Sequence, residues 1–307
     1  MELVSIIVPA YNRIDELVDA VKSILNQSYK NIEILIIDDY STVDIHSAIL
    51  LLNSDKIKYF KTNQNVGVTE ARKFGIENLN GDLITFLDDD DYISPNCIED
   101  KVKLFQSNPK LNFVMSDYLE NNLVNKNQIP HSMEKFAANF KVEICNRPGP
   151  FFQCCMFKRE LIKNYNLLFD NKAIPSEDWD FFLNISKLDL NIGYINQLDF
   201  TWNYSENSQS ANFYNEANGL NYILQKHKKL FLAQVGKSKL SDHYRMVARV
   251  FEKDNNFIEA AKNYKTAFKV DSLNYKNVFY FILLHLGETS FNFIVNKMRK
   301  LRGHSLG

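Results

Sequence analysis

The feature that most limits the possible folds is an alternation of short strand-like runs with amphipathic segments over about the first hundred residues. Strand-like runs occupy residues 4–8, 32–37, 57–60 and 83–87. Residues 14–26 and 68–78 carry apolar side chains at helical spacing. Strands that are joined by helices pair in parallel, because the crossover returns the chain to the same end of the sheet. The sequence therefore predicts an α/β fold that begins with a parallel sheet.

Polar clusters directly follow three of these predicted strands. They are Pro9 to Arg13, the pair Asp38-Asp39, and the run Asp88 to Asp91. Open parallel sheets bind ligands at the carboxyl ends of their strands. We therefore expect the three clusters to converge on a pocket that is rich in carboxylates.

The run from Asp88 to Asp91 places four carboxylates together at the end of an apolar strand. Adjacent carboxylates repel one another unless a cation or a set of hydrogen-bond donors offsets their charge. A hard divalent cation, Mg²⁺ or Mn²⁺, takes oxygen ligands and leaves positions open for substrate phosphates. The alternative is a solvated acidic turn or helix start ahead of Pro95.

The composition, 45% hydrophobic and 24% charged residues over 307 positions, is that of an ordinary globular protein. Its four cysteines (Cys97, Cys145, Cys154 and Cys155) have no Cys-x-x-Cys spacing, so we expect reduced thiols and a cytoplasmic protein. Met1 leads straight into the first strand without a basic segment, which predicts no signal peptide.

Charge is unevenly distributed along the chain. Residues 226–307 hold 16 Lys and Arg against 6 Asp and Glu, a net +10, while residues 1–225 hold 20 against 31, a net −11. The basic end favours contact with an anionic membrane surface, as in a peripheral protein on the inner face. A solvated lysine-rich helical surface is the alternative. We expect no nucleic-acid partner, and no pattern specifies an oligomeric state.

The C-terminal region carries two helical patterns. Small and large apolar residues recur as in one tetratricopeptide-like hairpin, at Tyr244, Val247, Ala248, Phe251, Ala260, Tyr264 and Ala267. A single repeat cannot bury its own faces, so we expect it to pack on the main body or on a partner. Residues 275–286 are nearly continuously apolar but too short to span a membrane. With the basic residues 297–302 they predict either an interfacial amphipathic end or core packing.

Several motifs, in order, resemble those of the family-two inverting glycosyltransferases of the GT-A fold. They cover about the first 95 residues and read Pro9-Ala10-Tyr11-Asn12-Arg13, Asp38-Asp39-Tyr40-Ser41, Asn65-Val-Gly-Val-Thr-Glu-Ala-Arg72 and Leu87-Asp88-Asp89-Asp90-Asp91. The resemblance implies a Rossmann-like, nucleotide-binding mixed sheet flanked by helices, followed by a C-terminal α-helical region. On this basis we expect a GT-A domain over residues 1–218, with a donor half (1–95) and an acceptor half (96–218), and a helical region over 219–307.

The resemblance also implies roles for individual residues. Asp90 and then Asp88 are the expected ligands of Mn²⁺ or Mg²⁺. Asp39 would accept the imide N–H of the base, Tyr11 would stack on the base, and Arg72 would face the phosphates or stabilise the acidic loops. Asp89 and Asp91 are left open between substrate contact and local structure. The whole nucleotide-sugar set is Pro9, Tyr11, Asn12, Arg13, Asp39, Asn65, Arg72, Asp88 and Asp89.

The second half contains Glu177-Asp178-Trp179-Asp180, which resembles the segment that supplies the family's catalytic base. Asp178 matches that base, whose role is to deprotonate an acceptor hydroxyl as it attacks the anomeric carbon. The same residues are also typical of a helix cap. The segment Asn203-Tyr-Ser205-Glu-Asn-Ser208-Gln-Ser210 keeps the serines of the family's Arg-x-His-x-x-Ser-x-Ser loop but lacks its Arg and His, so we assign it no role.

Together these features predict an inverting transferase that moves a sugar from a nucleotide-linked donor, UDP by family tendency, to a hydroxyl of a glycan or lipid-linked glycan. Such an activity serves surface polysaccharide synthesis. Two alternatives stay open. A nucleotidyltransferase also needs aspartates and a metal, but its glycine- and basic-rich loop is missing near the first strand. A non-catalytic scaffold would use the helical C-terminus.

Overall fold

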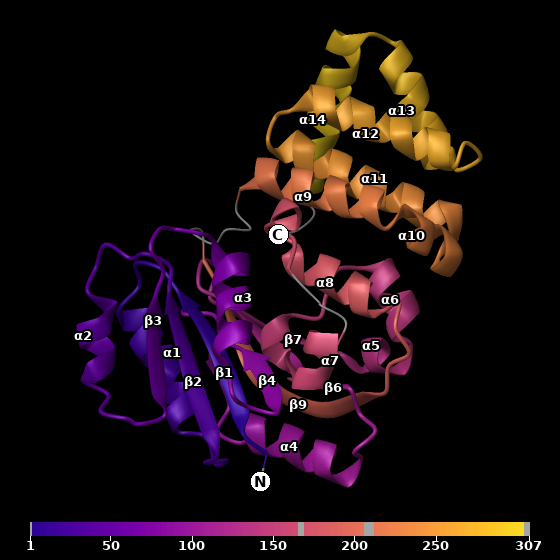
Figure 1. Cartoon of the computed structure of the whole chain (residues 1–307). Coiled ribbons are helices and arrows are strands. Elements are labelled where there is room, and N and C mark those ends of the chain that lie inside the picture. Colours follow the sequence, from indigo (N-terminus) through magenta and orange to yellow (C-terminus); the bar gives the residue numbers. More distant parts are fainter. Residues whose placement is uncertain (1, 165–168, 206–211, 304–307) are drawn as a thin grey trace. The chain divides into compact units, whose positions relative to one another are not determined.

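The computed structural model describes residues 2–164, 169–205 and 212–303 (Figure 1). The chain divides into two compact units. The first, which we call the sheet unit, comprises residues 1–144, 149–171 and 178–206. The second, the helical unit, comprises residues 145–148, 172–177 and 207–307. The boundary that the sequence predicts, at residue 218, falls inside a helix of the second unit.

The N-terminal half of the sheet is parallel, with the strand order β3-β2-β1-β4 (Figure 1). Its strands are β1 (Val4–Ala10), β2 (Ile32–Asp38), β3 (Ile57–Lys61) and β4 (Leu83–Phe86), all within a residue or two of their predicted limits. Every residue of β1 and β2 is buried, as in a sheet that is covered on both faces. The connecting helices are α1 (Asp15–Leu25), α2 (Ile45–Leu50) and α3 (Val68–Asn78).

The C-terminal half makes the sheet mixed, as predicted. Next to β4 lie β8 (Cys155–Lys158), β6 (Phe113–Asn122), β9 (Ile192–Tyr204) and β5 (Tyr92–Ile93), with β7 (Asn127–His131) paired to β6. Among the described strands of this half, only β6 and β9 run parallel. The helices here are α4 (Cys97–Ser107), α5 (Glu134–Ala138), α6 (Phe140–Asn146), α7 (Arg159–Asn164) and α8 (Glu177–Ile185), with short 3₁₀ turns at Phe152–Cys154 and Asn171–Ala173.

The turn into β4 requires a glycine. A Cβ on Gly81 would lie 2.5 Å from Ser5 Oγ and 2.7 Å from the Leu3 carbonyl oxygen. The Gly81 N–H instead donates to Ser5 Oγ and to Glu33 Oε1. This close approach sets the register of β4 against β1, and with it the position of the aspartates that follow β4.

A cluster of phenylalanines anchors the short helix that carries Asp178. Phe181 and Phe182 of α8 contact Phe152, with ring centroids 4.9 and 5.5 Å apart. Trp179 is buried, and its indole N–H donates to the Ile144 carbonyl at 2.7 Å. Because the side chains on either side of the carboxylate are fixed in the core, the start of α8 is held firmly.

The helical unit contains α9 (Phe213–Lys226), α10 (Lys228–Gln234), α11 (Gly236–Lys253), α12 (Phe257–Val270), α13 (Tyr275–His285) and α14 (Glu288–Gly303). The predicted hairpin corresponds to α11 and α12, and the seven apolar positions named for it are all buried. Of the helices in the described residues, none is both long and apolar enough to cross a membrane.

Candidate active site

The loops that follow β1, β2 and β4 meet at one edge of the sheet, as the topology predicts. Ala10 and Asp38 are register partners at the ends of β1 and β2. The Tyr11 N–H donates to Asp89 Oδ2 at 3.1 Å, and the Asn12 N–H donates to Ser41 Oγ at 2.9 Å. The first loop is therefore bonded to both acidic loops through its backbone.

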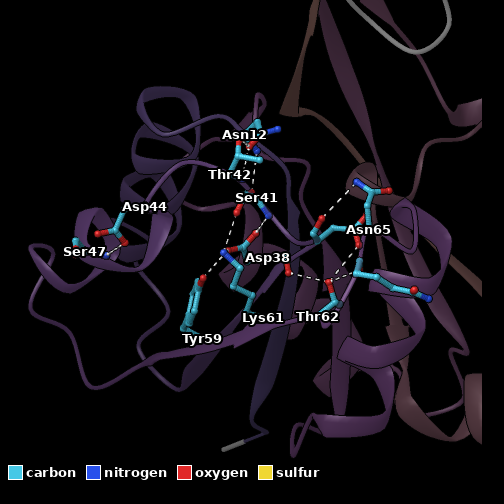
Figure 2. A network of polar contacts seen from close by, with 12 residues as sticks. Asn12, Asp38, Ser41, Thr42, Asp44, Ser47, Tyr59, Lys61, Thr62 and Asn65 are labelled. Atoms are coloured by element: carbon cyan, nitrogen blue, oxygen red, sulfur yellow. Dashed lines mark hydrogen bonds and ion pairs between the residues drawn. The ribbon is translucent and has the colours of Figure 1, made fainter.

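Asp38, the last residue of β2 (Figure 2), and Asp39, which follows it, organise the loops around them. Asp38 accepts hydrogen bonds from the Ser41 N–H and the Tyr59 hydroxyl, which lower its pKa although burial alone would raise it. Asp39 accepts the Val66 N–H at 2.7 Å and the Gly67 N–H at 2.8 Å, one on each oxygen. The Thr62 hydroxyl also lies 3.4 Å from Oδ1, whereas Oδ2 retains a second lone pair, so Asp39 is still able to accept from a base.

Two tyrosines border this edge. Tyr11, predicted to stack on a base, is 46% exposed, and Tyr40, which the sequence did not single out, is 51% exposed. Asn12 and Tyr40 have positive φ angles of 57° and 64°. The Asn12 side chain accepts from the Thr42 N–H at 2.8 Å and thereby stabilises its own loop (Figure 2). Both tyrosine rings are accessible to a planar ligand.

Asn65 and Pro9 lie at the same edge of the sheet, where Asn65 bonds to the main chain of a neighbouring loop and Pro9 belongs to a strand. Asn65 Nδ2 donates to the Asp39 carbonyl at 3.3 Å (Figure 2). Pro9 is buried within β1, in register with Ile37. These two residues, which were predicted to bind the nucleotide sugar, therefore shape the loops of the site.

The aspartate run divides into two buried and two open side chains. Asp89 and Asp91 are 6% and 2% exposed as residues, whereas the side chains of Asp88 and Asp90 are 31% and 25% exposed. Asp89 accepts from Tyr11 and Arg13, and Asp91 accepts the Asn203 N–H at 2.8 Å. The buried pair therefore fixes the neighbouring chain, and the open pair faces solvent.

Electrostatics within the run favour a bound cation. Burial raises the pKa of Asp89 to about 7, and burial together with Asp88 raises the pKa of Asp90. Arg13 Nη1 lies 2.8 Å from Asp89 Oδ1 and 2.5 Å from Asp90 Oδ2, which offsets part of the repulsion. Although burial opposes it, the pKa of Arg13 is raised by these two carboxylates.

The residues present fit a divalent metal that also binds the substrate. Asp88 and Asp90 offer two accessible carboxylates, the donor type that Mg²⁺ and Mn²⁺ prefer. Across the described ranges no group of three or more His, Cys, Asp or Glu side chains is placed to hold a metal alone. These residues support a metal site in which two protein carboxylates bind the cation and phosphate oxygens supply the remaining ligands.

Arg72 connects the aspartate run with Asp178. Its guanidinium is 3% exposed, donates to Asp88 Oδ1 at 2.8 Å, and lies 3.9 Å from Asp178 Oδ1. The same group lies 5.2 Å from the centroid of the Phe152 ring. Asp178 also accepts the Phe152 N–H at 3.2 Å, and its side chain is 18% exposed. One buried cation thus positions both carboxylates.

Two residues of the site were missed by the sequence analysis. Gln153, almost fully buried, donates to Asp88 Oδ2 at 2.5 Å. Asn203 donates through its side chain to the Asp90 carbonyl at 2.7 Å, in addition to its bond with Asp91. Asn203 opens the segment compared with the Arg-x-His loop, but Ser208 and Ser210 lie outside the described residues. No local pattern marks Gln153, which comes from a 3₁₀ turn.

The family model for glycosyl transferase family 2 matches residues 5–165, just over half of the chain. The chain belongs to this family. Its matched part holds the three loops of the site, Arg72 and Gln153, while Asp178 lies beyond it.

Curated relatives of this glycosyltransferase fall into two groups. WfaP of Escherichia coli, "UDP-Glc:alpha-D-GlcNAc-diphosphoundecaprenol beta-1,3-glucosyltransferase", is 33% identical over 220 residues, 70% of this chain and 83% of that protein. A Campylobacter jejuni "GalNAc(5)-diNAcBac-PP-undecaprenol beta-1,3-glucosyltransferase" is 28% identical over 315 residues, 98% of each chain. By contrast, the chain spans only 18% of the length of an uncharacterized Rickettsia conorii glycosyltransferase that is 46% identical over 114 residues.

Solved structures establish the fold. Staphylococcus aureus TarS 1–349, crystallised with UDP-GlcNAc, superposes with a TM-score of 0.67 at 18% identity over 89% of this chain and 84% of that one. The mannosyltransferase PcManGT of Pyrobaculum calidifontis, in complex with GDP-Man and Mn²⁺, gives 0.59 at 14% identity over 96% and 84%. The mixed sheet with flanking helices is therefore the GT-A fold, which confirms the predicted fold class.

Proposed function

We propose that this glycosyltransferase transfers a sugar from a UDP-linked donor, with inversion, to a hydroxyl of a glycan carried on a polyprenyl diphosphate. Two curated relatives with names of this kind support the acceptor class, and one of them matches the chain over 98% of its length. A nucleotide sugar is water-soluble and a polyprenyl carrier is a lipid, so the enzyme would work at the cytoplasmic surface of a membrane.

The sheet unit would bind the donor at its acidic edge. Tyr11 and Tyr40 offer rings for the base, and Asp39 offers the free lone pair of Oδ2 to the imide N–H. Asp88 and Asp90 would hold Mn²⁺ or Mg²⁺, which when bound neutralises the charge of the diphosphate. Arg13 and Arg72 already contact these carboxylates and would keep them aligned before the donor arrives.

Asp178 would act as the general base. It would take the proton of the acceptor hydroxyl while that oxygen bonds to the anomeric carbon and the bond to the diphosphate oxygen breaks. The attacking and departing oxygens lie on opposite faces, so the configuration inverts. The observation that carries this proposal is the bridge through Arg72, which holds Asp178 and Asp88 on one guanidinium.

Substitution of Asp178 tests the proposal. Asp178→Asn keeps the shape of the side chain and its acceptor for the Phe152 N–H but removes the base, so transfer should fall at least about a thousandfold. UDP-sugar binding, followed by thermal shift with Mn²⁺, should be retained. Asp189→Asn, which removes an exposed carboxylate of the same unit, is the matched control and should keep full activity. Full transfer by Asp178→Asn would refute the assignment.

A further inference from the structure

Two cavities of the helical unit adjoin each other. One, of about 280 Å³, lies between α11, the start of α13 and residues 146–148. The other, of about 460 Å³, lies between α11, α13 and α14. Arg245, Arg249 and Lys276 line both. The two cavities therefore lie on either side of a shared set of cationic residues.

The smaller cavity is strongly basic. Its lining includes Arg147, Lys239, Arg245, Arg249 and Lys276, with Asp242 as the one carboxylate among its lining residues. Asp242 pairs with Arg245, which also bonds to Asn277, so this arginine is fixed in place. His243 adds no positive charge near neutral pH, because burial lowers its pKa to about 4. The remaining cations repel one another unless an anion lies between them.

Three of these cations have no anionic partner within the described part of the protein. Lys239, Arg249 and Lys276 make no ion pair or side-chain hydrogen bond there, and Lys276 Nζ lies only over the Tyr275 ring, at 5.8 Å. Lysine and arginine side chains that surround a cavity are the usual recognition groups for phosphate oxygens. A cavity of about 280 Å³ has the volume of about nine waters at ~30 Å³ each, enough for a diphosphate.

The larger cavity has apolar walls. Tyr275 and Phe279, one helical turn apart on α13, are 76% and 46% exposed, and Tyr280 and Met298 complete the lining. Tyr280 is held rigidly, since its ring stacks on Tyr264 with centroids 3.8 Å apart. Exposed aromatic residues around a concave surface mark a site for an apolar ligand.

We propose that these two cavities bind the prenyl diphosphate end of the acceptor carrier. The basic cavity would hold the diphosphate and the aromatic cavity the first isoprene units. An amphipathic ligand with an anionic head and an apolar tail matches the order of charge and aromatic surface along the site. This inference rests on the proposed acceptor class and assigns the helical unit a role in carrier binding.

Binding of geranylgeranyl diphosphate to the full chain tests the proposal. The double variant Arg249→Glu/Lys276→Glu should weaken binding at least tenfold, because both residues line both cavities. The control Lys265→Glu/Lys269→Glu makes the same charge change at exposed positions of α12 that line neither cavity, and should bind like the native chain. Phe279→Ala should weaken binding of the prenyl compound but not of inorganic diphosphate. Ile282→Ala, also exposed on α13, is its control.

Transfer assays separate this proposal from the proposed function. The Arg249→Glu/Lys276→Glu variant should raise the KM for a polyprenyl diphosphate-linked acceptor tenfold or more. It should leave transfer to a soluble glycan acceptor without the carrier within twofold. Equal KM values with both acceptors would overturn the carrier site while leaving the transferase proposal intact. Equal losses in the control, or binding only to phosphatidylglycerol vesicles, would overturn it in favour of a general membrane contact.

Discussion

The sheet unit and the helical unit differ in whether their cationic side chains are paired with carboxylates. In the sheet unit, Arg13 contacts Asp89 and Asp90, and Arg72 contacts Asp88 and Asp178. In the helical unit, Arg249 and other cations line a cavity that contributes a single carboxylate. The first arrangement orders a set of like charges before any ligand is present, and the second leaves charges available to a ligand. The two regions should therefore respond differently to the same kind of substitution.

The largest effect should come from the open aspartates of the sheet unit. Asp88→Asn/Asp90→Asn removes both proposed metal ligands, so transfer should fall more than about a thousandfold. Calorimetric titration with Mn²⁺ in the presence of UDP should lose its binding signal. Asp82→Asn, an exposed carboxylate at the other end of β4, is the control and should titrate normally. Unchanged Mn²⁺ binding by the double variant would place the metal elsewhere.

A second, smaller effect should distinguish the buried aspartates from the open ones. Asp89→Ala removes the acceptor of the Tyr11 N–H and one partner of the half-buried Arg13, and leaving these donors without it should cost about 2 kcal/mol of unfolding free energy. Asp90→Ala removes a partly exposed charge and relieves repulsion, so its cost should stay below about 1 kcal/mol. Urea denaturation of the two variants measures both. Equal losses would show that the division into buried and open carboxylates has no energetic meaning.

The two regions should also lose stability over different pH ranges. Burial lowers the pKa of His243, in the helical unit, from 6.5 to about 4. Its protonation therefore favours the unfolded chain, and stability falls as the pH drops from about 6.5 to 4. Against the effect of burial, hydrogen bonds from Lys58, Ser5 and Asn80 lower the pKa of Glu33, in the sheet unit, from 4.5 to about 2. Its contribution is complete above about pH 4.5 and is lost as the pH falls toward 2. Each is worth roughly 3 kcal/mol.

Thermal unfolding as a function of pH checks this difference. His243→Gln should flatten the profile between pH 6.5 and 4 and leave the lower range unchanged. Glu33→Gln should do the reverse. If His243→Gln kept the native slope above pH 4, burial of the His243 ring would not be the source of the dependence.

The sequence predicted the parallel half of the sheet well, because each strand is a short run bounded by polar or turn residues. It did not predict β5, which has only two residues. Pairing in that half depends on distant partners, and local pattern does not report it.

At the site, the sequence predicted the aspartates, Arg72 and Asp178 as functional residues. It did not predict which carboxylates are buried and which are open. The separation of Asp88 and Asp90 from Asp89 and Asp91 depends on burial, which four identical neighbours cannot reveal in a sequence. Gln153 became visible only because a 3₁₀ turn brings it against a carboxylate 65 residues away in sequence. Neighbours of this kind are determined by the fold rather than by spacing along the chain.

The stereochemistry of transfer tests the central claim most directly. UDP-glucose, whose sugar is α-linked, would be incubated with the full chain, Mn²⁺ and a polyprenyl diphosphate-linked glycan, and the new linkage would be assigned from its anomeric NMR coupling. Attack assisted by Asp178 from the face opposite the diphosphate predicts a β-linked product. An α-linked product would contradict the account.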